Sequence, residues 1–167
     1  MAFSLSTVFS QSVTEDAAIA AAANKGRYIY FTVKYIDWPK QYKTGDFIIG
    51  VYGDEKLYKY VSSRYNGKFV GSQELKIVRF ISVNEVSGCH LLYVSSSKSS
   101  YIGQITKKVD HNKTLIITNK QGLINQGPTI NFIPVKGSLK WEINLSKARK
   151  YNFIIGEDLK KIAYNTI

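Results

Sequence analysis

The run His90-Leu91-Leu92-Tyr93-Val94 is almost entirely apolar, which is the pattern of a β-strand covered on both faces. Other short runs rich in β-branched and aromatic residues predict further strands at 47–52, 76–81 and 114–118. Apolar residues at helical spacing lie between these runs, at 57–61 and 97–109. Because strands that alternate with helices are joined by parallel crossovers, the sequence predicts an α/β fold.

A long helix is expected before the first strand. Its apolar residues recur at spacings of three and four and gather on one stripe: Ile19, Ala22, Gly26, Ile29, Val33 and Ile36. Thr14 is the expected N-cap, because Glu15 and Asp16 follow it and suit the positive end of the helix dipole. Trp38-Pro39 is expected to end the helix, since proline disfavours the α conformation of the residue before it.

The last third of the chain changes to alternating apolar and polar residues. Segments 129–135 and 138–144 alternate on either side of Lys136-Gly137, which predicts an antiparallel hairpin. Segments 146–151 and 157–164 predict short helices, and no Pro-rich or Ser/Gly-rich linker divides the 167 residues. The expected fold is a single layered α/β domain, with a mixed, largely parallel sheet flanked by helices and an antiparallel C-terminal hairpin.

Residues 1–13 are uncharged and mostly apolar or small, as at the end of a secretory leader that runs into its cleavage zone. The basic segment that usually begins a leader is missing, so a short segment that packs on the domain is the alternative. The expected organisation is a signal-peptide remnant at 1–13 and one domain at 14–167. No other stretch approaches the ~20 apolar residues of a membrane-spanning helix, so no transmembrane segment is expected in the mature domain.

The charge balance is strongly basic, because 23 Lys and Arg against 12 Asp and Glu give a net charge of +11. Such a charge favours polyanions or an anionic membrane surface as neighbours. The basic residues are scattered, however, which favours a solvated Lys-rich surface. Segment 27–38 mixes basic and aromatic residues as single-strand nucleic-acid platforms do, but on a helix these rings spread over several faces and suit packing. Nucleic-acid binding, testable by its salt dependence, is the alternative function.

The residue patterns of catalytic and cofactor sites are missing. Gly50-Val51-Tyr52-Gly53 stands where a nucleotide loop would, but lacks the third glycine of a dinucleotide site and the Lys-Ser/Thr of a P-loop. Adjacent residues of a strand point to opposite faces, so Cys89 is expected to pack as a small buried side chain rather than pair with His90. A single cysteine and two histidines exclude a Cys-rich zinc site. We expect no enzyme, cofactor or metal, the alternative being an enzyme whose residues lie far apart in sequence.

Several segments, taken in order, resemble a known family. They are the aromatic stretch ending in Trp38-Pro39, Ile49-Gly50-Val51-Tyr52-Gly53, Cys89-His90-Leu91-Leu92-Tyr93, Gly127-Pro128-Thr129-Ile130-Asn131-Phe132, the block 141–149 and segment 155–163. Together they make the chain similar to the YfiR/HmsC-like family. The matching residues, which the comparison implies are mainly structural, are Trp38, Pro39, Gly50, Gly53, Cys89, His90, Gly127, Phe132, Trp141, Asn144, Ala148 and Arg149.

The resemblance implies a periplasmic α/β protein, often dimeric, without catalytic residues. Members of the family restrain a membrane-bound diguanylate cyclase from the periplasmic side, and others are associated with sensor kinases. The chain is therefore expected to be an exported regulatory or sensory protein whose partner is the periplasmic part of a membrane signalling protein. The disulfide-forming cysteines of the best-known member are absent apart from Cys89, so redox control through an internal bridge does not carry over.

The block 141–149 also predicts its own local structure. Trp141 and Ile143 alternate onto one face of the expected strand, so the aromatic and aliphatic side chains enter the core together. Glu142 and Asn144 share the other face. Asn144 stands just before the expected helix, where its side-chain oxygen is expected to accept a backbone N–H and cap the helix.

Overall fold

The computed structural model describes the backbone of residues 4–167 and the side chains of residues 14–167. Its α-helices are α1 (Ser4–Tyr35), α2 (Glu55–Tyr65), α3 (Ile102–Val109), α4 (Leu145–Lys150) and α5 (Glu157–Ile162). Its strands are β1 (Ile36–Asp37), β2 (Phe47–Tyr52), β3 (Phe69–Val70), β4 (Gln73–Phe80), β5 (Leu91–Val94), β6 (Leu115–Thr118), β7 (Ile130–Val135), β8 (Ser138–Ile143), β9 (Ile154–Ile155) and β10 (Asn165–Thr166). Short 3-10 helices are η1 (Lys40–Tyr42), η2 (Val83–Glu85), η3 (Ser96–Tyr101) and η4 (Ile124–Gln126).

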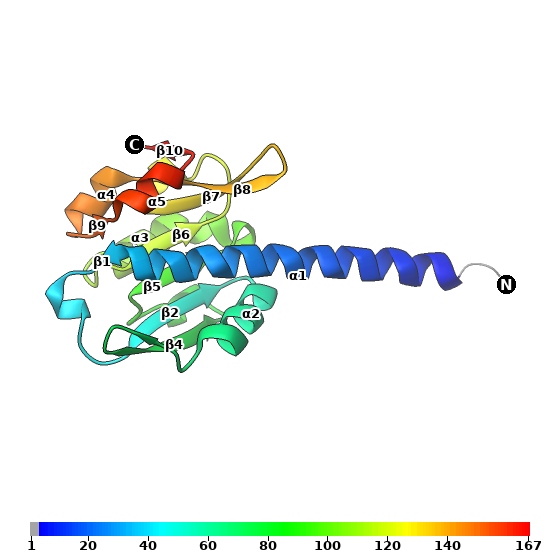
Figure 1. Cartoon of the computed structure of the whole chain (residues 1–167), viewed down its shortest axis with the longest axis horizontal. Helices are drawn as coiled ribbons and strands as arrows, with labels where there is room; N and C mark the ends of the chain where they lie inside the picture. The colour runs from blue at the N-terminus through cyan, green and yellow to red at the C-terminus, as the bar shows by residue number, and fades with distance from the viewer. Residues whose placement is uncertain (1–3) are drawn as a thin grey trace.

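The central sheet has the strand order β10-β8-β7-β6-β5-β2-β4-β3 (Figure 1). Its middle is parallel, because β2 pairs parallel with both β4 and β5, and β5, β6 and β7 follow in parallel. β7 and β8 pair antiparallel and form the C-terminal hairpin, with Phe132 opposite Trp141. The mixed, largely parallel α/β fold predicted from the sequence is confirmed.

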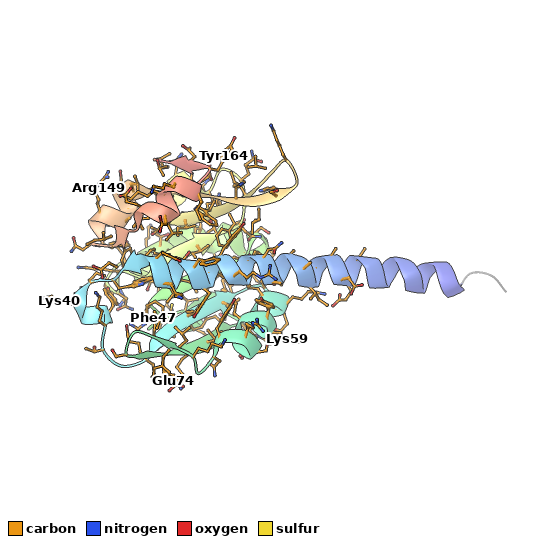
Figure 2. The ribbon with its side chains drawn as sticks, in the orientation of Figure 1. Lys40, Phe47, Lys59, Glu74, Arg149 and Tyr164 are labelled. Atoms are coloured by element: carbon orange, nitrogen blue, oxygen red, sulfur yellow. The ribbon has the colours of Figure 1, made fainter. Side chains whose placement is uncertain are left out.

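Two apolar cores lie on the two faces of the sheet. On one face, α1 and α2 pack through Ile29 and Leu57 on strand residues such as Phe47. On the other face, α3 packs through Ile105 on residues such as Leu92. These side chains are almost completely buried, and Figure 2 shows Phe47 inside the fold. The helical layers therefore account for strands that are apolar on both faces.

Helix α1 begins at Ser4, so the prediction that Thr14 caps its N-terminus was wrong. Thr14, Glu15 and Asp16 lie inside the helix instead. The acidic pair suggested a start there only because acidic side chains favour first turns. Neither residue breaks a helix, and the alanines that follow are strong helix formers.

The predicted apolar stripe of α1 is buried at Ala22, Ile29 and Val33. Gly26 belongs to this stripe, and a Cβ there would lie 2.5 Å from the Tyr60 ring, so the missing side chain allows α1 to approach α2. Ile19 is the exception, with 51% of its surface exposed. Ile19 instead lines a hollow between α1 and α2, together with Tyr60 and Ser63.

Deletion of residues 2–11 is expected to leave the melting temperature almost unchanged. Among the described side chains of α1, the first buried one is Ala22, and the N-terminal half of the helix projects from the body (Figure 1). Residues 1–3 of the predicted leader lie outside the described residues. Circular dichroism during heating measures the effect, with Ile29→Ala as a control that should lose ~2–5 kcal/mol. A fall of many degrees in the deletion variant would make this segment part of the fold.

The end of α1 is tied to α5 by contacts that the sequence does not predict. β1 pairs antiparallel with β9, with Ile36 opposite Ile155. The backbone N–H of Gly156 donates to the Tyr35 carbonyl oxygen at 2.9 Å. A Cβ on Gly156 would lie 2.6 Å from that oxygen, so glycine is needed for this close approach. The helix predicted at 157–164 ends at Ile162 and is followed by β10.

Candidate interaction surface

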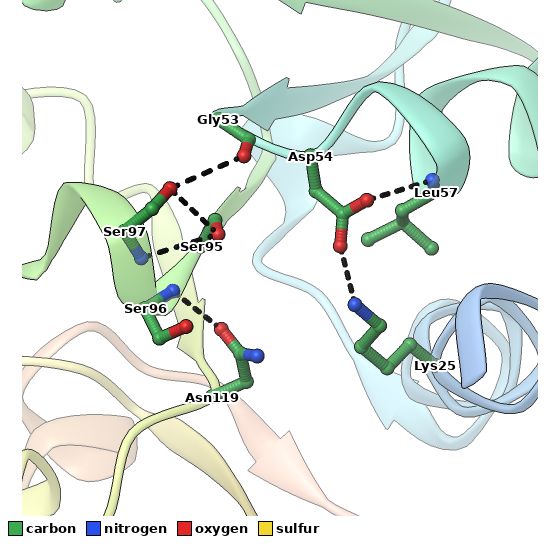
Figure 3. A network of polar contacts seen from close by, with 8 residues as sticks. All are labelled: Lys25, Gly53, Asp54, Leu57, Ser95, Ser96, Ser97 and Asn119. Carbon is green, nitrogen blue, oxygen red and sulfur yellow. Dashed lines mark hydrogen bonds and ion pairs between the residues drawn. The ribbon is translucent and has the colours of Figure 1, made fainter. Parts of the chain in front are cut away.

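Polar side chains gather at the carboxyl ends of β2, β5 and β6 (Figure 3). The chain leaves β2 toward α2 on one face of the sheet and leaves β5 toward α3 on the other. In open α/β sheets, ligands commonly bind in the crevice that forms where neighbouring strands connect to opposite faces of the sheet. Residues 53–54, 95–97 and 119 form the cluster here.

Hydrogen bonds join the three loops of this cluster to one another. Ser96 N donates to Asn119 Oδ1 at 2.7 Å, and the Ser97 hydroxyl donates to the Gly53 carbonyl oxygen at 3.4 Å. Gly53 has a φ of +85°, and a Cβ there would lie 2.4 Å from the Lys98 side chain. The positive φ of Gly53 fits the predicted tight turn. Gly53, Asp54 and Lys98 also line a hollow of 220 Å³ beside the cluster.

Asp54 joins this cluster to α1. Its Oδ1 accepts the Leu57 N–H at 2.9 Å and caps α2, while its other carboxylate oxygen pairs with Lys25 (Figure 3). Both charged side chains are about six-sevenths buried, with 14% and 15% of their surfaces exposed. The pair therefore holds α1 against the start of α2.

Asn131 of β7 forms a second polar contact set, which the sequence analysis missed. Its Oδ1 accepts the Thr118 hydroxyl at 2.7 Å and the Lys120 N–H at 3.2 Å. Its Nδ2 donates to Lys120 O at 3.0 Å and to Glu142 Oε2 at 2.9 Å. A single asparagine within an apolar strand was the available signal, because a buried amide needs partners for its whole hydrogen-bonding capacity.

Cys89 and His90 lie on opposite faces of the sheet, as predicted. Cys89 is buried in the α3-side core, and burial raises the pKa of its thiol to about 12. His90 stacks on Phe47 with ring centroids 4.7 Å apart, and its Nδ1 accepts the Ile48 N–H at 3.0 Å. Burial lowers the pKa of His90. The two side chains do not form a thiolate and base pair.

Acidification is expected to destabilise the fold through His90. Its pKa is lowered in the folded state, so the unfolded chain takes up the proton first, and stability present above pH ~6.5 is lost as the pH falls through the folded value. Protonation also removes the acceptor for the Ile48 N–H. Urea unfolding between pH 7.5 and 5 measures the slope, which His90→Asn should reduce and His111→Asn, in an exposed turn, should keep. Equal slopes in both variants would assign the titration to other groups.

The block 141–149 adopts the predicted local structure. Trp141 and Ile143 are buried in the α1-side core. Asn144 Oδ1 accepts the backbone N–H of the third residue of α4 at 2.8 Å, which confirms the predicted cap. Ala148 is buried and Arg149 is exposed.

The other family-motif residues are spread through the fold: Trp38, Pro39, Gly50, Gly53, Gly127 and Phe132. Gly127 has a φ of +127°, and a Cβ on Gly50 would lie 2.5 Å from the Phe80 ring. The indole N–H of Trp38 donates to the Val33 carbonyl oxygen at 3.2 Å. These positions support a structural role for the motif, which stays a prediction.

A hollow of 360 Å³ lies between α1, β8 and α5. Tyr28 and Trp141 form its floor, with their rings edge to face and centroids 4.4 Å apart. Phe31, Tyr35 and Ile162 form its apolar rim, with 43%, 43% and 57% of their surfaces exposed. We call this hollow the α1–α5 groove. Exposed apolar patches of this kind mark interaction sites in proteins.

Sequence reasoning placed the aromatic residues of the groove on a long helix but did not find the groove itself. The rings at 27–38 do spread over several faces, since Tyr30 stacks on Tyr65 while Phe31 and Tyr35 face solvent. The opposite wall comes from α5, far away in the sequence. Tertiary contacts bring the walls together, among them the Gly156 bond to Tyr35 and the Trp141 bond to Leu159.

Within residues 14–167, no three His, Cys, Asp or Glu side chains are grouped as metal ligands. None of the described helices combines the length and the hydrophobicity needed to cross a membrane. The α1–α5 groove combines an apolar lining with exposed aromatic and aliphatic rim residues, which fits a binding role.

The sequence pattern of the YfiR/HmsC-like family matches residues 22–164. No curated protein matches the chain. The fold is similar to "the ABC domain in complex with L-Trp" from Streptococcus pneumonia, with a TM-score of 0.53 and 13% identity over 73% of this chain and 55% of that chain. A conserved domain protein from Vibrio cholerae gives a TM-score of 0.52 and 12% identity over 72% and 54%. The chain spans about half the length of both structures, and at these identities the likeness shows the fold alone.

Proposed function

The chain belongs to the YfiR/HmsC-like family, and we propose that it is a non-enzymatic periplasmic protein that binds and restrains a membrane-bound signalling protein. The family consists of regulators, and a diguanylate cyclase or a sensor kinase is the proposed partner. The observation that carries the proposal is the α1–α5 groove, an exposed apolar hollow suited to a protein side chain. The uncharged segment 1–13 supports export.

Deletion of the gene in the source bacterium tests this proposal. Loss of the restraint should raise cyclic diguanylate or the phosphorylation output of a membrane kinase. The full chain should restore the original level, whereas the same chain retained in the cytoplasm should not. Unchanged signalling in the deletion strain would reject the function.

Nucleic-acid binding is the second candidate, and the net charge of +11 is the observation that favours it. A stacking platform needs a row of exposed rings beside basic residues. The rings at 27–38 are instead divided between the core and the groove. Binding of single-stranded DNA that strengthens steeply as salt falls would support this candidate.

A further inference from the structure

A second hollow, of 250 Å³, lies between α4, β9 and α5. Ile154 is 64% exposed at this hollow. Arg149 lines it from α4 and Lys160 lines it from α5, and Figure 2 shows Arg149 on the outside of this layer. We call it the α4–α5 groove. Helix α5 is therefore bordered by one groove through Ile162 and by the other through Lys160, while Leu159 is buried beneath it.

We propose that the two grooves and α5 form one docking surface for a segment of a partner protein that carries two apolar side chains flanked by carboxylates. This inference rests on the proposed function and names the chemistry of the partner. Each groove accepts one apolar side chain, and α5 lies between the two. The carboxylates meet the basic side chains beside the grooves.

The shape of the surface favours a protein over a membrane. Its exposed apolar side chains line concave hollows, and a hollow accommodates a single anchoring side chain of a partner. Peripheral membrane proteins instead place an apolar helix face against the lipid. The smaller size of the α4–α5 groove fits a shorter anchor than the α1–α5 groove does.

The charges favour an acidic partner. Three cations line the two grooves, Arg149, Lys160 and Lys161, against the single carboxylate of Asp158. Lys160 is paired with Glu157 at 2.5 Å, but neither Arg149 nor Lys161 forms an ion pair with the described part of the chain. The net charge of +11 adds a long-range attraction for acidic surfaces.

The same charges disfavour a second copy as the occupant. Two copies would each carry a net charge of +11, so long-range repulsion opposes their association. Like charges held together across an interface are unfavourable.

Selection of peptides from a random display library against the full chain provides a probe without knowledge of the partner. The enriched peptides should contain two apolar residues flanked by Asp or Glu. Fluorescence anisotropy of an enriched peptide then measures its affinity. Phe31→Ala and Ile154→Ala, one in each groove, should each weaken binding about tenfold, as truncation of an anchor contact does. Lys161→Glu should also weaken it, and less so at high salt.

Phe69→Ala on β3 and Lys107→Glu on α3 are matched controls, because both side chains are exposed far from α5 in sequence and on other elements. Both should bind the peptide like the unchanged chain. Enriched peptides that are basic, or binding that survives both groove variants, would overturn the inference. So would binding to phosphatidylglycerol vesicles, or a dimer in sedimentation, that is lost in the same groove variants.

Complementation of the deletion strain separates this inference from the proposed function. If deletion leaves signalling unchanged while the peptide results hold, only the proposed function fails. If the unchanged chain restores signalling and the Phe31→Ala, Ile154→Ala double variant restores it equally, the docking surface is wrong and the function stands.

Discussion

Trp141→Ala is expected to lower the free energy of unfolding by ~3–5 kcal/mol, as truncation of a buried aromatic side chain does. The indole is 4% exposed and lies opposite Phe132 in the hairpin. The Tyr28 ring meets it edge to face at 4.4 Å. Its N–H donates to the Leu159 carbonyl oxygen at 3.4 Å, which leaves that acceptor without its partner in the variant. The indole therefore joins α1, the hairpin and α5.

Urea unfolding measures the loss, with Asn144→Ala as the comparison. Removal of the α4 cap at Asn144 should cost only ~1 kcal/mol, because the variant loses the cap bond and a long bond of 3.4 Å to the Ile124 carbonyl oxygen. An unchanged midpoint for Trp141→Ala would show that the indole is an exposed anchor and that the faces of β8 are wrongly assigned. Because Trp141 also forms the floor of the α1–α5 groove, its substitution is not a clean test of docking.

Local patterns were enough to predict most of the central sheet. The apolar runs that became β2, β5 and β6 are short, and β-branched or aromatic residues occur in each, so a strand is their most favourable local state. The hairpin of β7 and β8 followed from alternation around Lys136-Gly137, and the cap at Asn144 followed from its place before α4. These features depend on neighbours in sequence.

Features that depend on distant contacts were missed. Strands β1, β9 and β10 are each two residues long, which is too short for a periodic pattern in the sequence. The Lys25 pair with Asp54 joins residues that no local spacing connects. Both grooves exist only because α5 packs beside α1 and α4. The predicted start of α1 was wrong because acidic residues occur both in the first turn of a helix and in its interior, so their presence alone does not mark the start.

Asn131→Leu is expected to lower the free energy of unfolding by ~2–4 kcal/mol, although leucine has nearly the same size. Asn131 and Thr118 are both fully buried. The substitution leaves the Thr118 hydroxyl, the backbone N–H and carbonyl of Lys120 and the Glu142 carboxylate without the partners that the amide supplies. An unsatisfied buried polar group costs ~1–3 kcal/mol, so the loss exceeds that of an ordinary hydrogen bond.

Thr118→Val in the Asn131→Leu background tests this explanation. If the cost arises from the stranded hydroxyl, the second substitution removes that hydroxyl, and the double variant should be less destabilised than the sum of the two single variants. Residues in direct contact commonly show such couplings of ~0.5–3 kcal/mol, and Thr118 Oγ1 lies 2.7 Å from Asn131 Oδ1. Strictly additive losses would mean that the two side chains act independently. The stability of Asn131→Leu would then reflect packing of the leucine, and the amide would not organise the carboxyl ends of β6 and β7.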